Sequence, residues 1–196
     1  IKRWRAAHPL CPLVLVLTGT DLYGDIHTDA GARDSLALAD CLVVLQPLGL
    51  DQLDPGLRAK ARVICQSVRA PKRLKRPSGS FLVTVLGHLR AVKDPFRAAY
   101  ALKYLPPESG IRLVQLGAAM SPQFALEARS LMHSEPRYHW LGERSHTDAM
   151  RWLGRSHAMV ISRRMEGGAH VVSEAIAAGV PVLASDVAGN IGLLGE

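Results

Sequence analysis

The chain has 196 residues, of which 48% are hydrophobic and 21% charged, and its formal net charge at pH 7 is +7. This length suffices for one large domain or two small ones with a sizeable core, and the composition is that of a soluble globular protein. The first apolar run, residues 9–17, is too short to span a bilayer and carries no small-residue cleavage site. We therefore expect neither stable membrane insertion nor a targeting segment.

The first third of the chain alternates predicted strands with helices. Apolar, β-rich runs predict strands at 13–17, 41–45 and 62–65, the first of them buried on both faces. Between these runs, helix-like spacing lies at 33–40 and, interrupted by proline, at 48–60, and a polar loop is expected at 18–25. The order strand, helix, strand, helix, strand predicts a parallel sheet with right-handed crossovers.

Three cysteines, Cys11, Cys41 and Cys65, are far apart and form no Cys-x-x-Cys pair. All three lie in or beside apolar runs, and a free cysteine behaves as a small hydrophobic residue. We therefore expect reduced, buried, structural thiols in a cytoplasmic protein.

A basic, proline-bearing segment interrupts the alternation at 69–80. Its cations are Arg69, Lys72, Arg73, Lys75 and Arg76, and Pro71 and Pro77 lie among them. A nucleic-acid patch is one interpretation, but no zinc-finger spacing and no RNP-like aromatic motif accompany it. We favour a solvated linker between domains and expect no nucleic-acid partner, while the positive field would attract anionic substrates.

After this segment the alternation restarts with five predicted strands. They lie at 81–86, 111–116, 138–141, 158–161 and 182–184. Asp94-Pro95 and Ser121-Pro122 predict helix starts, because each places a capping side chain before a proline at the first helical position.

Glycine-bearing loops follow these strands. They contain Gly87, Gly117, Gly142 and the Gly167-Gly168 turn. In open α/β sheets, ligands bind outside the carboxyl ends of the strands, so the loops predict a binding edge.

The most informative stretch is 166–185. Gly167 and Gly168 lack a Cβ, so their backbone can take unusual angles and admit a ligand closely. The helix that follows begins with unpaired N–H groups and a positive dipole end, which suit phosphate or sugar hydroxyls. Glu174 comes seven residues after Gly167 and is expected on the same helix face as the turn. Gly179 fits the position just past this helix.

The pattern Glu166-x7-Glu174, set in a glycine turn, a helix and a strand, resembles the donor-binding signature of GT-B glycosyltransferases of the glycogen-synthase-like GT4 type. The resemblance implies an α/β protein with two Rossmann-like domains. It places a partial N-terminal, acceptor-side domain at 1–70, a linker at 71–80 and a C-terminal nucleotide-sugar-binding domain at 81–196. Because three strands bury little and no methionine begins the chain, we expect an incomplete N-terminal domain. Because the chain stops at Glu196, soon after the last predicted strand, we expect a truncated C-terminal domain.

Carried onto this sequence, the family's donor-binding roles fall first on the glycine turn and its helix. Glu166 would hydrogen-bond sugar hydroxyls, and Glu174 would accept both ribose hydroxyls, as an ionised carboxylate can. The residues after Glu166 that would help to bind the sugar or phosphate are Gly167, Gly168, Ala169 and His170.

The family's glycine-arginine…lysine motif, which neutralises the diphosphate, matches residues 87–93. Lys93 falls on the lysine and is, with Glu166, a candidate catalytic residue. The arginine position holds His88, and Arg90 is a candidate replacement. Gly142 lies in the loop that would bracket the base. The resemblance implies no metal ion and no other cofactor.

On the acceptor side, the family often has a His-Gly-x-Asp turn where this chain has Thr18-Gly19-Thr20-Asp21. The histidine is therefore absent, and Thr18, Gly19 and Asp21 are the candidate acceptor-side residues. Asp21 is expected to brace its own turn rather than to act catalytically.

Four segments together resemble the selenosugar synthases of selenoneine biosynthesis (SenB type), namely 18–23, 87–95, 164–169 and 186–195. Those enzymes join selenium, delivered as selenophosphate, to the anomeric carbon of a UDP-sugar such as UDP-N-acetylglucosamine. Such a nucleophile is already ionised and depends less on a general base, which is consistent with the missing histidine. Two alternatives stay open. One is an ordinary GT4 transferase with a carbohydrate or lipid acceptor, and the other is a non-catalytic nucleotide-sugar-binding fragment.

Overall fold

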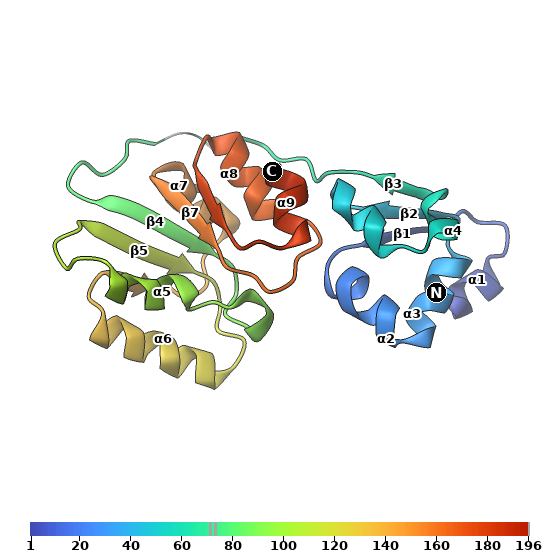
Figure 1. Ribbon diagram of the computed structural model, residues 1–196, viewed down its shortest axis with the longest axis horizontal. Coiled ribbons are helices and arrows are strands. Elements are labelled where there is room, and N and C mark those ends of the chain that lie inside the picture. The colour runs from blue at the N-terminus through green and yellow to red at the C-terminus, as the bar shows by residue number, and fades with distance from the viewer. Residues whose placement is uncertain (71, 73, 196) are drawn as a thin grey trace. The chain divides into compact units, whose positions relative to one another are not determined.

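The computed structural model, shown in Figure 1, describes residues 1–70, 72 and 74–195. Pro71 and Arg73 of the basic segment, and Glu196 at the end of the expected C-terminal domain, lie outside the described residues. Contacts between Cα atoms divide the chain into two units. The first unit comprises Ile1–Ser67, Met165–His170 and Asp186–Glu196, and the second comprises Val68–Arg164 and Val171–Ser185.

The first unit is built on a three-stranded parallel sheet in the order β1-β2-β3. Its strands are β1 (Val14–Leu17), β2 (Cys41–Val44) and β3 (Ala61–Val63). Its helical segments are α1 (Lys2–Ala7), η1 (Asp21–Asp25), α2 (Ile26–Thr28), α3 (Ala30–Leu38), η2 (Pro47–Gln52), α4 (Pro55–Arg58) and α9 (Ala188–Leu194). One face of the sheet, with Leu17, Leu42 and Val44, packs against Leu22 and Leu36 to form the core.

The other face of β1 is exposed, with Val14 at 56% and Val16 at 45% of full accessibility. The prediction of a strand buried on both faces is therefore wrong for β1. This strand lies at an edge of the sheet, whereas in the central β2 Leu42, Val43 and Val44 are all buried. A run of β-branched residues indicates a strand, but burial depends on the neighbours that cover it.

The second unit contains a five-stranded sheet in the order β6-β5-β4-β7-β8, and every neighbouring pair is parallel. Its strands are β4 (Phe81–Leu86), β5 (Ile111–Leu116), β6 (Tyr138–Trp140), β7 (Ala158–Ile161) and β8 (Val182–Ala184). All five predicted strands are thus confirmed, and the mixed α/β class with parallel, Rossmann-like sheets is the predicted one.

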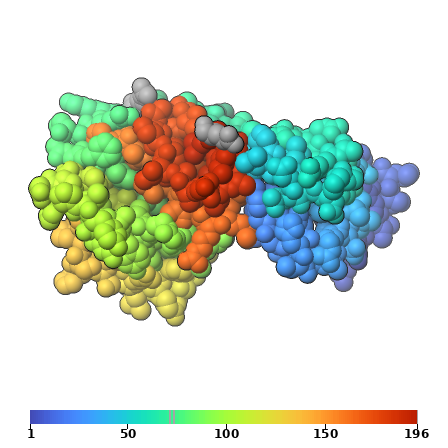
Figure 2. Space-filling model, in the orientation of Figure 1, coloured from blue at the N-terminus to red at the C-terminus, as the bar shows by residue number. Residues whose placement is uncertain are grey.

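The helical segments of this unit are η3 (Ala91–Lys93), α5 (Arg97–Ala101), η4 (Leu102–Tyr104), α6 (Pro122–Ser134) and α7 (His146–Gly154). A further helix, α8 (His170–Ala178), begins with the last residue of the first unit. One sheet face, with Val85 and Leu113, packs against α5, η4 and α6, while the opposite face packs against α7 (Figure 1). Figure 2 shows α5 in yellow-green beside α6 in yellow. Among the described residues, no helix has the length and apolar character needed to cross a membrane.

One of the two predicted helix caps is confirmed. Ser121 precedes α6 and its Oγ accepts the Phe124 N–H at 3.4 Å. Asp94 does not cap α5, because it ends η3 with φ at +43° and the helix begins only at Arg97. Its carboxylate instead accepts a hydrogen bond from Arg97 Nε at 2.6 Å. Aspartate tolerates the left-handed region, and residue type alone does not distinguish that turn from a cap.

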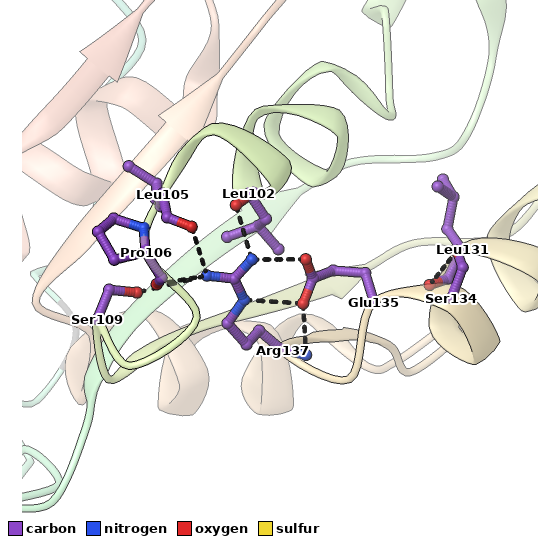
Figure 3. A network of polar contacts seen from close by, with 8 residues as sticks. All are labelled: Leu102, Leu105, Pro106, Ser109, Leu131, Ser134, Glu135 and Arg137. Carbon is purple, nitrogen blue, oxygen red and sulfur yellow. Dashed lines mark hydrogen bonds and ion pairs between the residues drawn. The ribbon is translucent and has the colours of Figure 1, made fainter.

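The amino edge of the five-stranded sheet is braced by Arg137 (Figure 3). Its guanidinium donates to the Glu135 carboxylate at 2.6 and 2.8 Å, and to the carbonyls of Leu102 at 2.7 Å, Pro106 at 3.0 Å and Leu105 at 3.3 Å. The hydrogen bond between the two side chains raises the pKa of Arg137 and lowers that of Glu135. This network ties the connection before β5 to the turn before β6.

The three cysteines are free thiols, but the expectation that they are buried is wrong for Cys11 and Cys65, which are exposed. Cys11 lies in the loop before β1, and Cys65 lies past the end of β3. The apolar neighbour Ile64 is itself 55% exposed, so an apolar run in the sequence did not indicate a covered site.

Candidate functional site

The strand order of the second unit creates a topological switch point beside β4. From β4 the chain builds β5 and β6 on one side and later β7 and β8 on the other. In open parallel sheets the loops diverge at such a point and leave a crevice where ligands bind. A pocket lies here, and its lining includes Gly87, His88, Lys93, Ser162 and Arg163.

Two glycines hold the backbone close at this carboxyl edge. Gly87 follows β4 with φ at +150°, and Gly117 follows β5 with φ at +149°. A Cβ on Gly117 would lie 2.1 Å from the Gly87 carbonyl oxygen, which excludes any larger residue without a backbone shift. A Cβ on Gly87 would lie 3.3 Å from Lys93 Nζ. The glycines therefore let a cation approach the main chain at the switch point.

Like charges crowd this pocket. Burial, followed by the charges of Arg163 and Arg90, lowers the pKa of Lys93 to about 8. Burial, followed by the charge of Arg90, lowers the pKa of Arg163 to about 10. Both shifts mean that the charged forms of Lys93 and Arg163 are less stable in the ligand-free protein than they would be in water. A bound anion would stabilise these charged forms. The site is thus electrostatically suited to an oxyanion such as phosphate.

Of these cations, the sequence patterns identified Lys93 and Arg90 but missed Arg163. Arg163 follows β7 by two positions and therefore lies at the same carboxyl edge as Gly87. The signal available in the sequence was a basic residue two positions after the predicted strand at 158–161.

His88 lines the pocket, but one of its ring nitrogens makes a structural hydrogen bond. Its Nδ1 accepts the N–H of Ala118 at 3.1 Å, which joins the loops after β4 and β5. Arg90 is exposed and influences Lys93 and Arg163 through its charge. The roles assigned to His88 and Arg90 in diphosphate binding remain predictions.

Glu174 is a buried carboxylate on α8, with 6% of its side chain exposed. Its Oε1 lies 2.6 Å from Nε2 of His146, the first residue of α7. A buried carboxylate is costly unless it is hydrogen-bonded, and His146 is one of its partners. A ribose bound by Glu174 would share the carboxylate with this histidine, to which the sequence patterns assigned no role.

Gly142 follows β6 in the left-handed region, with φ at +72°. Its carbonyl accepts the Gly117 N–H at 2.8 Å, so this oxygen holds the loops after β5 and β6 together. Glycine is needed here for its conformation, and the predicted contact with a base is not tested by this geometry.

The Glu166 turn belongs to the first unit. Glu166 Oε1 accepts the N–H groups of Gly167 at 3.2 Å and Gly168 at 3.4 Å. Neither glycine has a positive φ, so the expectation of unusual backbone angles is wrong. Both are required by packing instead, because a Cβ on Gly167 would lie 1.9 Å from the Thr18 carbonyl oxygen and one on Gly168 would lie 2.6 Å from Leu45 Cβ.

The residues after this turn differ in exposure. Ala169 is buried and His170, at the start of α8, is exposed. Their expected contacts with the sugar or phosphate remain predictions, as does the sugar contact of Glu166.

The acceptor-side loop after β1 is braced by Asp21, as its sequence indicates. The Asp21 carboxylate accepts the N–H groups of Thr18 at 2.9 Å and Gly19 at 2.6 Å. Residues 18–25 are not entirely a loop, because the helical segment η1 begins at Asp21. The carboxylate thus holds the end of β1 to the start of η1, which is a structural role.

The structure therefore brings together two groups of predicted residues. His88, Arg90 and Lys93 gather at the switch point of the second unit, whereas Thr18 and Gly19 approach Gly167 in the first unit. In the part of the chain that the structure describes, no three His, Cys, Asp or Glu side chains are grouped as metal ligands. The expectation that no metal is required stays a prediction.

Comparison with known sequences identifies one family. The family described as "Glycosyl transferases group 1" matches residues 68–196, which is more than half of the chain. The Xenopus tropicalis protein "Glycosyltransferase 1 domain-containing protein 1" is 30% identical over 114 residues, covering 58% of this chain and 33% of that protein.

Solved structures are similar over most of the chain. Anabaena Alr3699/HepE, in complex with UDP and glucose, has a TM-score of 0.76 at 18% identity, covering 94% of this chain and 55% of that one. The catalytic domain of Starch Synthase IV from Arabidopsis thaliana, bound to ADP and acarbose, has a TM-score of 0.65 at 13% identity, covering 80% of this chain and 41% of that one.

The chain thus spans about half the length of HepE and a third of the Xenopus relative. At such identities the structural likeness shows the fold, a Rossmann-like α/β architecture that resembles GT-B glycosyltransferases. Together with the family match over residues 68–196, it leads to one conclusion: the chain belongs to the glycosyl transferases group 1 family.

Proposed function

We propose that this chain carries the donor site of a glycosyltransferase that uses a UDP-sugar. The observation that carries the proposal is the switch-point pocket, where Lys93 and Arg163 lie beside the Gly87 backbone. Crowded cations at the carboxyl edge of a parallel sheet suit the diphosphate of a nucleotide sugar. The family match supports glycosyl transfer, and the UDP bound to HepE supports the choice of nucleotide.

In the proposed reaction, the bond between the anomeric carbon and the UDP oxygen breaks. Negative charge develops on the departing diphosphate, and Lys93 stabilises that charge in a partly buried pocket. Glu174, in the same unit as Lys93, binds the ribose hydroxyls. Positioning and electrostatics thus supply the chemistry on the donor side.

For the acceptor, we propose selenophosphate, with UDP-N-acetylglucosamine as the donor. Selenium attacks the anomeric carbon, a carbon–selenium bond forms, and UDP leaves. Water then attacks phosphorus and cleaves the phosphorus–selenium bond, which releases inorganic phosphate and the selenosugar. Support comes from the resemblance to selenosugar synthases and from Thr18, which stands where related transferases have a histidine. Asp21 is already engaged by the N–H groups of Thr18 and Gly19. An ionised selenium nucleophile does not require a base there.

The donor assignment is tested by calorimetry with UDP and UDP-N-acetylglucosamine on the full chain. Glu174→Ala is expected to weaken binding of both ligands by roughly tenfold to a hundredfold, because hydrogen bonds to a charged group are lost. Glu108→Ala removes the same charge from an exposed position and serves as the control. Absence of UDP binding by the wild type, or equal binding by wild type and Glu174→Ala, would contradict the site.

The acceptor is tested separately by mass spectrometry of reactions with UDP-N-acetylglucosamine. Selenophosphate, thiophosphate and simple sugars are offered in parallel. A product carrying selenium on the sugar is expected with selenophosphate. A product formed only with a carbohydrate or lipid acceptor would instead indicate an ordinary transferase, and donor binding without any product would indicate a binding module.

A further inference from the structure

Two basic side chains reach the switch-point pocket from different strands. Lys93 belongs to η3, which follows β4, whereas Arg163 follows β7. Both approach the Gly87 backbone, because a Cβ placed there would lie 3.3 Å from Lys93 Nζ and 3.9 Å from an Arg163 Nη2. The ends of β4 and β7 flank the crevice, so an anion bound in it lies between the two cations.

Hydrogen bonds around Arg163 fix the segment that carries it. Ser185 Oγ donates to the Arg163 carbonyl at 2.7 Å. The N–H of Arg164 donates to the Val92 carbonyl at 3.0 Å, which ties the segment after β7 to η3, where Lys93 lies. Ser162 Oγ donates to the carbonyl of Asp94 at 3.0 Å and adds a second tie. These bonds tie the main chain that carries Arg163 to the main chain that carries Lys93, so little backbone ordering is required when an anion binds.

His88 is poorly suited to bind an anion in this pocket. The Nδ1 of His88 accepts the Ala118 N–H at 3.1 Å, so this ring nitrogen is already engaged within the fold and does not donate to a phosphate. Arg90, the other candidate, is exposed and is not among the residues that line the pocket. Arg163 lines it directly.

We propose that Arg163 is the second diphosphate-binding cation of this chain, and that it works with Lys93 in place of the arginine that the family pattern has at residue 88. The assignment rests on the nucleotide-sugar site proposed above. Guanidinium offers parallel N–H donors that match two oxygens of a phosphate, while lysine supplies a point charge. Lys93 follows β4 and Arg163 follows β7, so the two cations would contact the diphosphate from opposite sides. They would stabilise its negative charge as it leaves.

The test is calorimetry on the full chain with three probes, namely UDP, inorganic pyrophosphate and uridine. Arg163→Gln is expected to bind UDP and pyrophosphate roughly tenfold to a hundredfold more weakly than the wild type, as for loss of a charge-assisted hydrogen bond. Its affinity for uridine is expected to be unchanged. Arg129→Gln removes the same charge from an exposed position on α6, and it is expected to bind all three probes as the wild type does.

Two milder variants keep the assignment testable if Arg163→Gln folds poorly. Ser185→Ala removes the hydroxyl that holds the Arg163 carbonyl, and it is expected to weaken UDP binding by about threefold to tenfold. Arg163→Lys retains the charge without the parallel N–H donors of the guanidinium, and it is expected to bind UDP more weakly than the wild type.

The outcomes separate this assignment from the proposed function. A folded Arg163→Gln that binds UDP and pyrophosphate like the wild type overturns the role of Arg163 and leaves the UDP site standing. Pyrophosphate binding that depends on Arg163, without any UDP binding, supports the cation pair and contradicts the nucleotide. A wild type that binds neither probe overturns both.

Discussion

The two edges of the five-stranded sheet each hold an arginine in an opposite electrostatic setting. At the amino edge, Arg137 donates to Glu135 and to three carbonyls, and its pKa is raised. At the carboxyl edge, Arg163 lies near Arg90 and Lys93, and its pKa is lowered to about 10 by burial and then by the charge of Arg90. One edge pairs opposite charges within the fold, whereas the other gathers like charges.

This difference shows how one fold separates stability from binding. A cation matched by a carboxylate and carbonyls holds two connections together. Cations crowded in a partly buried pocket disfavour one another, and this cost is relieved when an anion binds. Ligand binding at the carboxyl edge is therefore expected to stabilise the second unit by mass action.

The largest effect is expected from Gly117→Ala at the carboxyl edge, with Gly110→Ala at the amino edge as its matched control. Both glycines have positive φ, +149° and +68°, but a Cβ meets nothing within 4 Å at Gly110 and lies 2.1 Å from the Gly87 carbonyl oxygen at Gly117. We expect the free energy of unfolding to fall by about 3 kcal/mol for Gly117→Ala and about 1 kcal/mol for Gly110→Ala. Denaturant titration followed by circular dichroism measures both, and equal losses would contradict the steric account.

A pH titration of UDP binding is expected to give the next largest effect. Because the pKa of Lys93 is lowered to about 8, this lysine is charged below pH 8 and loses its proton as the pH rises through that value. A bound diphosphate favours the charged form, so affinity is full below pH 8 and falls by roughly tenfold per pH unit above it. The phosphate of UDP is already ionised there, so the charge of the diphosphate does not change over this range.

The control for this titration is Arg163→Gln. Removing the charge of Arg163 removes one cause that lowers the Lys93 pKa, so the alkaline loss of affinity is expected to shift to higher pH. UDP affinity that stays constant from pH 7 to about pH 9.5, where a lysine with the lowered pKa would be largely neutral, would contradict a charged Lys93 in the site.

The smallest effect is expected from Arg137→Ala at the amino edge. It removes the donors to Glu135 and to the carbonyls before β5, and we expect the melting temperature to fall by about 5 °C. UDP affinity measured at a temperature where the variant is folded is expected to be unchanged. A loss of UDP affinity in this variant would show that the two edges are not independent.

Local patterns in the sequence account for most of the fold. The apolar runs that become β4, β5 and β7, and the Ser121-Pro122 start of α6, depend on neighbouring residues, and the structure shows them where they are predicted. The exposure of Val14 and Val16 depends on what covers β1, and the left-handed Asp94 depends on a turn that many residue types can form. The exposure of β1 and the conformation of Asp94 depend on tertiary contacts, and the spacing of apolar residues in the sequence does not predict such contacts.

The residues of the candidate site likewise fall into those that a local motif identifies and those that depend on tertiary contacts. Lys93 and Glu174 could be singled out because each belongs to a motif within one segment. Arg163 and His146 belong to no such motif. Their roles depend on partners that the fold brings close, namely Lys93 across the β4–β7 crevice for Arg163 and Glu174 on α8 for His146. Gly167 was predicted to need unusual backbone angles, whereas its missing Cβ instead accommodates the Thr18 carbonyl.

The most direct test of a diphosphate site at the carboxyl edge is the difference in affinity between UDP and uridine for the full chain at pH 7. In the wild type, UDP is expected to bind at least about tenfold more tightly than uridine, and Lys93→Ala is expected to remove most of that difference. Equal affinities of the wild type for UDP and uridine, or a difference that Lys93→Ala leaves unchanged, would contradict the account.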